Sequence, residues 1–231
     1  MPSGSSAPTL RYERQLLGSG ARLLCSVDEV GRGALSGPVT VGMVLIDATV
    51  RSAPAGVRDS KLLTPERRQV LAPRIRRWAL GYAVGHASAS EIDAVGIIAA
   101  LRLAGHRALA ALGEEPDVIL LDGSHDWLTP PAQESMFDEP GPVTSVAPVV
   151  TRVKADMTCS SVAAASVLAK TERDDLMMTL SHVHPDYRWD ENKGYATPEH
   201  LEAIRLRGTC DQHRRSWRLP DREEADPNGR T

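Results

Sequence analysis

The stretch from Cys25 to Gly33 constrains the fold of this chain more than any other part of the sequence. Residues 23–27 form an apolar run typical of a buried strand, and two adjacent acids, Asp28 and Glu29, follow it directly. Burying a carboxylate without a partner costs on the order of several kcal/mol, so these acids need a partner or an exposed strand end. On a regular strand the two side chains point to opposite faces. A shared site would therefore require a bulge or a strand end here, which Gly31 permits.

The turn Gly31-Arg32-Gly33 suits close contact with a ligand. The two glycines let backbone N–H groups approach a bound anion, and Arg32 places a phosphate-seeking cation beside them. The alternative is a solvated turn after an edge strand, which is favoured for an isolated Asp-Glu pair.

The composition is that of an ordinary soluble globular protein with room for one sizeable domain. The chain has 231 residues, of which 42% are hydrophobic and 25% charged. It has no run of about 18 apolar residues and no N-terminal signal pattern, so we expect a cytoplasmic protein without a membrane segment.

The three cysteines are widely spaced, which argues against a disulfide scaffold or a cysteine zinc site. The seven histidines show no ligand spacing, and His182 and His184 are expected at the surface.

The formal net charge of −3 implies that any binding of a polyanion depends on local basic patches. The segment 64–79 is one basic stretch. Its arginines are expected on a solvated face, although such a face could also follow phosphates: Arg67, Arg68, Arg74, Arg76 and Arg77.

Periodicity and turn signals predict strands first and then alternating helices and strands. We expect helices over 10–17, 64–79 with Thr64 as cap, 90–112 with Ser90 as cap, 160–181 and 197–207. We expect strands over 23–27, 39–46 antiparallel to the first, 81–87, 117–121 and 143–153, with surface loops over 47–63 and 124–142. This order predicts an α/β or α+β domain with a mixed central sheet.

Acids stand at the ends of three expected strands: Asp28 with Glu29, then Asp122, then Asp156. Asp122 alone could be a turn residue and Asp156 alone a helix cap. Four carboxylates brought together would repel one another and raise each other's pKa values. A hard divalent cation relieves that repulsion, and an all-oxygen set selects Mg²⁺ or Mn²⁺. Two such ions about 4 Å apart would suit cleavage of a phosphodiester.

The helix expected after Asp156 carries polar residues along one face. Ser166 and Lys170 are one turn apart, and Arg173 and Asp174 follow on the next turn. An apolar helix that keeps such a stripe is interpreted as presenting it to an anion. The alternative is a surface stripe with an ordinary intrahelical ion pair.

Taken together, these motifs resemble bacterial ribonuclease HII over roughly residues 21–218. The stretches that carry the resemblance are 25–33, Asp59-Ser60-Lys61, Leu121-Asp122-Gly123, Lys154-Ala155-Asp156, 161–170, Arg173-Asp174 and Lys193-Gly194-Tyr195. The resemblance implies a ribonuclease H-like fold, with a mixed central sheet flanked by helices and a small C-terminal helical part at about 184–218. Residues 1–20 would be a partly flexible leader and 219–231 a disordered polar tail.

The resemblance also implies an activity: hydrolysis of the RNA strand of RNA–DNA hybrids, and cleavage 5′ of single ribonucleotides in duplex DNA, with Mn²⁺ or Mg²⁺. The metal-binding and catalytic acids would be Asp28, Glu29, Asp122 and Asp156. The substrate-binding residues would be Gly31, Arg32, Gly33, Ser60, Lys61, Ser166, Lys170, Arg173, Lys193 and Tyr195, with the pair Arg214-Arg215 as a further basic candidate. The expected partners are these nucleic acids, and the expected state is a monomer.

Three alternatives remain at this point. A DNA nuclease on the same fold would have no 2′-hydroxyl for Gly31-Arg32-Gly33 and Tyr195 to read. A type HIII ribonuclease H would normally carry an added N-terminal domain. A non-catalytic nucleic-acid-binding module with a structural cation would place four acids where a polyanion binds, which is electrostatically unfavourable.

Overall fold

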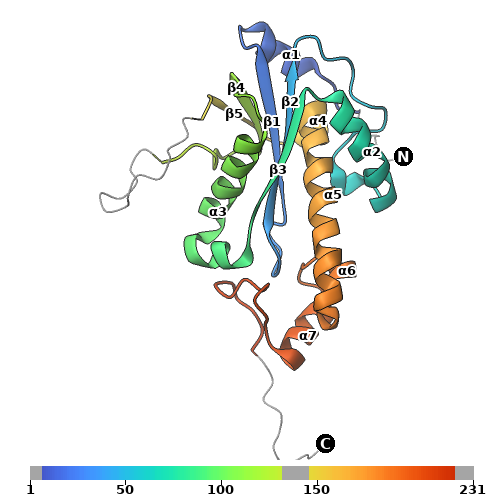
Figure 1. The fold of residues 1–231 in the computed structure, drawn as a ribbon, viewed down its shortest axis with the longest axis vertical. Coiled ribbons are helices and arrows are strands. Elements are labelled where there is room, and N and C mark those ends of the chain that lie inside the picture. Colours follow the sequence, from blue (N-terminus) through green and yellow to red (C-terminus); the bar gives the residue numbers. More distant parts are fainter. Residues whose placement is uncertain (1–6, 132–145, 222–231) are drawn as a thin grey trace, which may run out of the picture.

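The computed structural model describes residues 7–131 and 146–221. Its centre is a five-stranded sheet, whose arrangement Figure 1 shows. The strands are β1 (Leu23–Val30), β2 (Val39–Asp47), β3 (Gly81–Ala87), β4 (Val118–Asp122) and β5 (Val149–Arg152). Their order is β3-β2-β1-β4-β5. Strands β1, β2 and β3 pair antiparallel, whereas β1, β4 and β5 pair parallel. The predicted mixed sheet and the antiparallel pairing of its first two strands are confirmed.

Helices cover both faces of this sheet. They are α1 (Arg11–Gly18), α2 (Pro65–Trp78), α3 (Ala89–Ala111), α4 (Ala155–Thr158), α5 (Ser160–Val183), α6 (Trp189–Asn192) and α7 (Pro198–Arg207), with 3-10 turns η1 (Ser60–Leu62) and η2 (Pro185–Tyr187). Helix α3 lies on one face, and α5 lies on the other with α2 beside it (Figure 1). Alternate residues of β1 enter the two cores, Leu24 on the α5 side and Cys25 and Val27 on the α3 side, as the two-residue period of a strand requires.

Two glycines allow the helices to pack closely on the sheet. A Cβ on Gly42 of β2 would lie 2.5 Å from the carbonyl oxygen of Ala165 in α5. A Cβ on Gly85 of β3 would lie 2.1 Å from the carbonyl oxygen of Ala104 in α3. Neither position accommodates a side chain without a shift of backbone, so these glycines set the spacing between the layers.

Helix α3 is long and apolar enough to cross a membrane by length and composition. Its buried side instead packs on the sheet through residues such as Leu101, Ala104 and Ala108, and non-helical backbone at Gly96 interrupts it. The helix therefore covers one face of the sheet with one side and turns its other side outward.

Several element boundaries differ from the sequence-based prediction. Ser88, not Ser90, caps α3, because its hydroxyl accepts from Glu91 N while the Glu91 carboxylate accepts from Ser88 N. The strand predicted over 143–153 extends only over Val149–Arg152, and residues 143–145 lie outside the described residues. The predicted surface loop after Asp122 places Trp127 and Leu128 in the core against α3.

The C-terminal helical part has its own small apolar cluster, in which Trp189 and Ile204 pack around Met177 from α5. The predicted flexibility of residues 1–6 and of the 222–231 tail concerns segments outside the described residues.

Candidate active site

The four predicted acids lie at one end of the sheet. Strands β1 and β4 last pair at Val27 and Leu121, and the next residue along each strand is Asp28 and Asp122 respectively. Asp156 lies in the first turn of α4, directly after β5. Because β1, β4 and β5 are parallel, their carboxyl ends share one edge of the sheet.

A hydrogen bond from α4 to β4 fixes part of this arrangement. The Asp122 Oδ1 atom accepts from the backbone N of Ala155 at 2.6 Å and from that of Asp156 at 3.4 Å. Lys154, directly before α4, has a positive φ of 57° and turns the chain from β5 into the helix. The carboxylate of one predicted ligand therefore positions the helix that carries another.

The acids form one electrostatic cluster. Burial, followed by the charge of Glu29 and those of Asp122 and Asp156, raises the pKa of Asp28 well above its usual range. Burial and the Asp122 charge likewise raise the pKa values of Glu29 and Asp156. The charge of Asp59, a residue to which the sequence assigned no role, further raises the pKa of Asp156. The folded protein therefore brings carboxylates together at a cost in electrostatic free energy, and a bound cation would remove that cost.

Two side-chain cations lie close to these acids. The Lys61 Nζ atom lies 3.4 Å from Asp156 Oδ2 and 3.7 Å from Asp59 Oδ1, and its side chain is 72% exposed. The Arg32 Nη1 atom lies 3.8 Å from Glu29 Oε1. Two exposed cations do not balance five neighbouring carboxylates. The all-carboxylate donor set and its excess negative charge fit one or more hard divalent ions.

Ser60 and Ser166 lie beneath the acids and not on the surface. Both are buried, their hydroxyl oxygens are 2.8 Å apart, and Ser166 Oγ accepts from Ser60 N at 3.4 Å. The nearby Ser166 hydroxyl lowers the pKa of Asp28 and partly opposes the effect of burial. The two serines therefore link η1 to α5 beside Asp28, and we interpret them as residues that position this carboxylate.

Lys170 belongs to a buried ion-pair network. Its Nζ lies 2.5 Å from Asp174 Oδ1, and Arg68 Nη2 of α2 lies 2.8 Å from Asp174 Oδ2. The intrahelical pair named as the alternative is thus present. The prediction that Arg68 belongs to a solvated face is wrong, because its side chain is only 8% exposed and also donates to carbonyl oxygens of Ser60 and Leu63.

Arg173 supports the Gly31-Arg32-Gly33 turn from below. It is fully buried, and its Nε, Nη1 and Nη2 atoms donate to carbonyl oxygens of Pro38 at 2.9 Å, Lys193 at 2.9 Å and Ser36 at 3.2 Å. Gly31 has φ of +82°, and a Cβ there would lie 2.1 Å from Arg173 Nε. The guanidinium takes the space that a side chain at this position would need.

Arg214 supports the same turn from the C-terminal part. It is fully buried, and it donates to the carbonyl oxygens of Gly31 at 2.6 Å and Arg32 at 2.9 Å. The guanidinium nitrogens of Arg173 and Arg214 all donate to backbone carbonyl oxygens, so the structure gives both arginines backbone partners where the sequence predicted contact with the nucleic acid. Arg215, next in the chain, is exposed.

Tyr195, in the loop after α6, is connected to the turn through Arg173, which lies beside both. The Arg173 guanidinium carbon lies 5.6 Å from the centre of its ring, and Leu35 N donates to the carbonyl oxygen of Gly194 at 2.8 Å. Lys193 donates from its Nζ to the carbonyl oxygen of Asp190 and is half-buried. The predicted Gly31-Arg32-Gly33 turn and Tyr195 are therefore brought together, with Arg32 and Gly33 exposed.

Comparison with known proteins agrees with this geometry. The family model for ribonuclease HII matches residues 25–219. A ribonuclease HII from Streptomyces avermitilis is 46% identical over 215 residues, which cover 93% of this chain and 85% of that protein. The fold resembles ribonuclease H2 from Pyrococcus horikoshii OT3, with a TM-score of 0.64 and 25% identity over 84% of this chain and 93% of that one.

A second solved structure of this kind is a PCNA:RNase HII complex from Archaeoglobus fulgidus. It matches with a TM-score of 0.62 and 25% identity, over 89% of this chain and 99% of that one. These matches confirm the predicted ribonuclease H-like fold, and members of the group are divalent-metal-dependent hydrolases. The chain belongs to the ribonuclease HII family of endonucleases.

Proposed function

We propose that this chain hydrolyses the RNA strand of RNA–DNA hybrids and cuts 5′ of single ribonucleotides embedded in duplex DNA. The observation that carries the proposal is the cluster of Asp28, Glu29, Asp122 and Asp156 at one end of the sheet, beside a stiffened Gly31-Arg32-Gly33 turn. The acids supply a place for the reacting phosphate, and the turn supplies a place for the sugar.

The four acids would hold Mg²⁺ or Mn²⁺. When bound, such ions activate water and stabilise both oxygens of an in-line displacement, which leaves a 3′-hydroxyl and a 5′-phosphate. The chain's own residues orient the ligands: the Ser166 hydroxyl favours the charged form of Asp28, and Asp122 holds the first turn of α4. Lys61, which pairs with Asp156, would meet a phosphate oxygen of the substrate.

The turn and Tyr195 would recognise the ribonucleotide. A 2′-hydroxyl is both donor and acceptor, so it can be read by backbone groups, and a tyrosine ring offers a flat surface to a sugar or base. Recognition of a hydroxyl by backbone groups requires a rigid turn. Arg214 hydrogen-bonds to the carbonyl oxygens of Gly31 and Arg32 within the turn, and Arg173 hydrogen-bonds to that of Pro38 beyond it. One 2′-hydroxyl would then suffice for recognition.

Exposed cations around the site would bind the phosphates. Arg32, Lys61 and Arg215 are exposed and Lys193 is half-buried, whereas Arg173 is buried. Because binding then depends on counterion release, affinity for duplexes should fall steeply between low and moderate salt despite the net charge of −3. An affinity that stays flat over this range would show that these cations do not form the docking surface.

The metal site is tested by Asp28→Asn, with Asp117→Asn as matched control. Asp117 precedes β4 at the opposite end of the sheet and accepts from Arg22 N and Leu23 N. We expect Asp28→Asn to lose cleavage in Mn²⁺ and in Mg²⁺ while hybrid affinity stays within about threefold, since the phosphate contacts remain. Near-normal turnover of Asp28→Asn would refute the assignment.

The recognition site is tested by Tyr195→Ala on two substrates, a duplex with one ribonucleotide and a long RNA–DNA hybrid. We expect cleavage of the single-ribonucleotide duplex to fall at least as much as that of the hybrid, because this duplex offers the protein only one 2′-hydroxyl to recognise. If the unmodified protein cuts only the long hybrid in Mn²⁺, the role given to the turn and Tyr195 is wrong, even where the metal site is right.

A further inference from the structure

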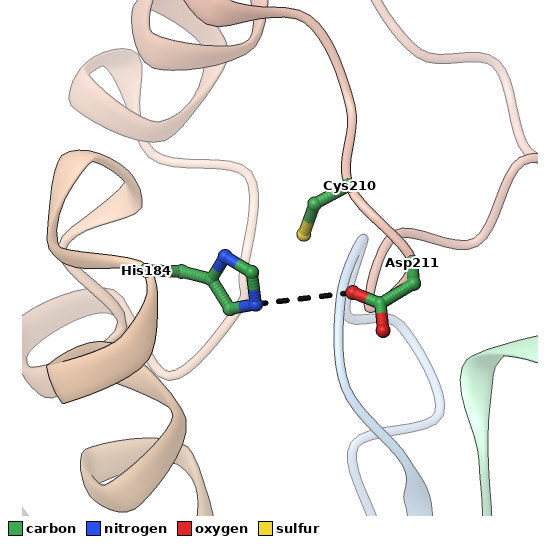
Figure 2. Close-up of side chains that lie close together, drawn as sticks. All are labelled: His184, Cys210 and Asp211. Atoms are coloured by element: carbon green, nitrogen blue, oxygen red, sulfur yellow. Dashed lines mark ion pairs between the residues drawn. The ribbon is translucent and has the colours of Figure 1, made fainter.

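A second group of metal-binding side chains lies in the C-terminal part, apart from the four acids. His184 follows α5, and Cys210 and Asp211 lie in the loop after α7 (Figure 2). Their ligand atoms all lie within 4.8 Å of one another, and His184 Nε2 is 3.8 Å from Asp211 Oδ1. Figure 2 shows the three side chains directed toward a common point from two segments distant in the sequence.

The chemistry of this group differs from that of the acid cluster. The group combines a soft thiolate, a borderline imidazole and a hard carboxylate; zinc binds all three ligand types, and the sulfur and nitrogen ligands favour it over Mg²⁺ or Ca²⁺. Zinc bonds of about 2.0–2.3 Å in a tetrahedron place ligand atoms about 3.3–3.8 Å apart, so small side-chain rotations would close the set around an ion. Three protein ligands leave the fourth position to water.

We propose that His184, Cys210 and Asp211 bind one Zn²⁺ ion, which fastens the loop after α7 to the C-terminal end of α5. On binding, the Cys210 S–H bond breaks, its proton passes to solvent, and the thiolate sulfur bonds to the metal, so no redox change is involved.

The protein holds these ligands in place without the ion. His213 is buried, and its Nδ1 accepts from the backbone N of Cys210 at 3.0 Å and lies 3.3 Å from Cys210 Sγ. The His184 ring packs edge-on against Trp189, with ring centres 5.4 Å apart. Two ligands are therefore pre-positioned by packing, while the Asp211 side chain is 75% exposed and leaves the site open to an ion from solvent.

The loop that would be fastened also supports the recognition turn. Gly37 N donates to the carbonyl oxygen of Gln212 at 2.8 Å, and Arg214 bonds to the carbonyls of Gly31 and Arg32. An ion at Cys210 would restrain this loop where it meets the turn. The sequence does not reveal the site because His184 and the pair Cys210-Asp211 lie far apart along the chain and meet only in the folded protein.

The test titrates the full chain with Co²⁺ in buffer with excess Mg²⁺, which occupies the acid cluster. Co²⁺ bound by a thiolate gives a charge-transfer band in the near ultraviolet, which carboxylates alone do not give. We expect one Co²⁺ per chain with this band, displaced by Zn²⁺. The band should be absent in Cys210→Ser, and affinity should fall at least tenfold in His184→Gln and Asp211→Asn. His182→Gln replaces an exposed histidine in the last turn of α5, close to His184 in the sequence; it is the matched control and should bind Co²⁺ normally.

Thermal unfolding gives a second readout that does not depend on colour. Zn²⁺ at about a hundredfold excess over its Kd should raise the Tm of the unmodified chain by about 5 °C or more, and should raise that of Asp211→Asn much less. Asp211 is exposed, so its variant is expected to fold. Absence of the band, a band that persists in Cys210→Ser, or an equal Tm shift in Asp211→Asn would each overturn the proposal.

Discussion

Replacing Arg173 by Met tests whether this arginine supports the recognition turn or binds a phosphate. Methionine keeps much of the side-chain volume and removes the three donors that satisfy the carbonyls of Pro38, Lys193 and Ser36. A hydrogen bond from a charged donor contributes about 1.5–3 kcal/mol, and breaking a buried charged arrangement costs about 3–5 kcal/mol in total. Because the three bonds share one side chain, we expect a loss of about 4 kcal/mol in free energy of unfolding.

For a chain of 231 residues this loss corresponds to a decrease of roughly 10 °C in Tm. Arg173→Lys should be intermediate, since an ammonium group keeps the charge but cannot reach three separated carbonyls. The functional readout is cleavage of the single-ribonucleotide duplex, which should fall more than cleavage of a long hybrid when the turn loses its support.

Salt dependence separates the two roles of Arg173. Each phosphate contact contributes about 0.9 to the slope of log K against log salt concentration. Measured in the Asp28→Asn protein to prevent cleavage, Lys61→Met should lower that slope by about one contact, whereas Arg173→Met should leave it unchanged. An unchanged Tm with a slope lower by about 0.9 in Arg173→Met would refute the positioning role and restore the phosphate contact expected from the sequence.

Three further outcomes are expected. Glu91→Gln should lower the free energy of unfolding by about 1 kcal/mol at pH 7, as measured with urea, because the Arg107 guanidinium lowers the pKa of Glu91 to about 2. This stabilisation is present above about pH 4.5 and is lost as the pH falls toward 2, so the difference in unfolding free energy between the variant and the unmodified chain must narrow at low pH. Gly85→Ala should cost about 2–3 kcal/mol, since its Cβ meets backbone, while Gly18→Ala, which meets nothing within 4 Å, should cost nothing measurable. Ser166→Ala should lower kcat about tenfold with hybrid Kd unchanged, because it removes the hydroxyl that favours the charged form of Asp28; an unaltered kcat would contradict that role.

Much of the fold was predictable because its signals are local. The strand from Leu23, the Thr64 cap of α2 with Pro65 in its first turn, and the apolar run of β4 are each encoded within a few residues. The gathering of the acids also followed from local pattern, since an acid directly after an apolar strand marks the carboxyl end of that strand, and parallel strands share one edge.

The roles of the arginines were not predictable in the same way. Arg68, Arg173 and Arg214 look in the sequence like groups for solvent or for an anion, yet all are buried. Their partners are mostly backbone carbonyls from segments far away along the chain, and nothing in the local sequence marks a carbonyl as an acceptor. Arg68 is a mixed case, since it also pairs with Asp174. The sequence pattern therefore identifies the charged side chains but not the groups to which they hydrogen-bond or pair.

Asp28 and Glu29 are adjacent on a strand, and the lengths of the neighbouring strands explain how both reach one site. A bulge or strand end at the acid pair was predicted because adjacent side chains of a strand point to opposite faces, but β1 pairs with β2 in unbroken register through Val30. On the other side of β1, pairing with β4 stops at Val27, so no strand there separates the two faces beyond this residue. Both carboxylates can then approach Asp122 around the open side of β1, which agrees with the Asp122 charge raising the pKa of each. The unequal lengths of neighbouring strands, and not a distortion of one strand, bring the acid pair to a single site.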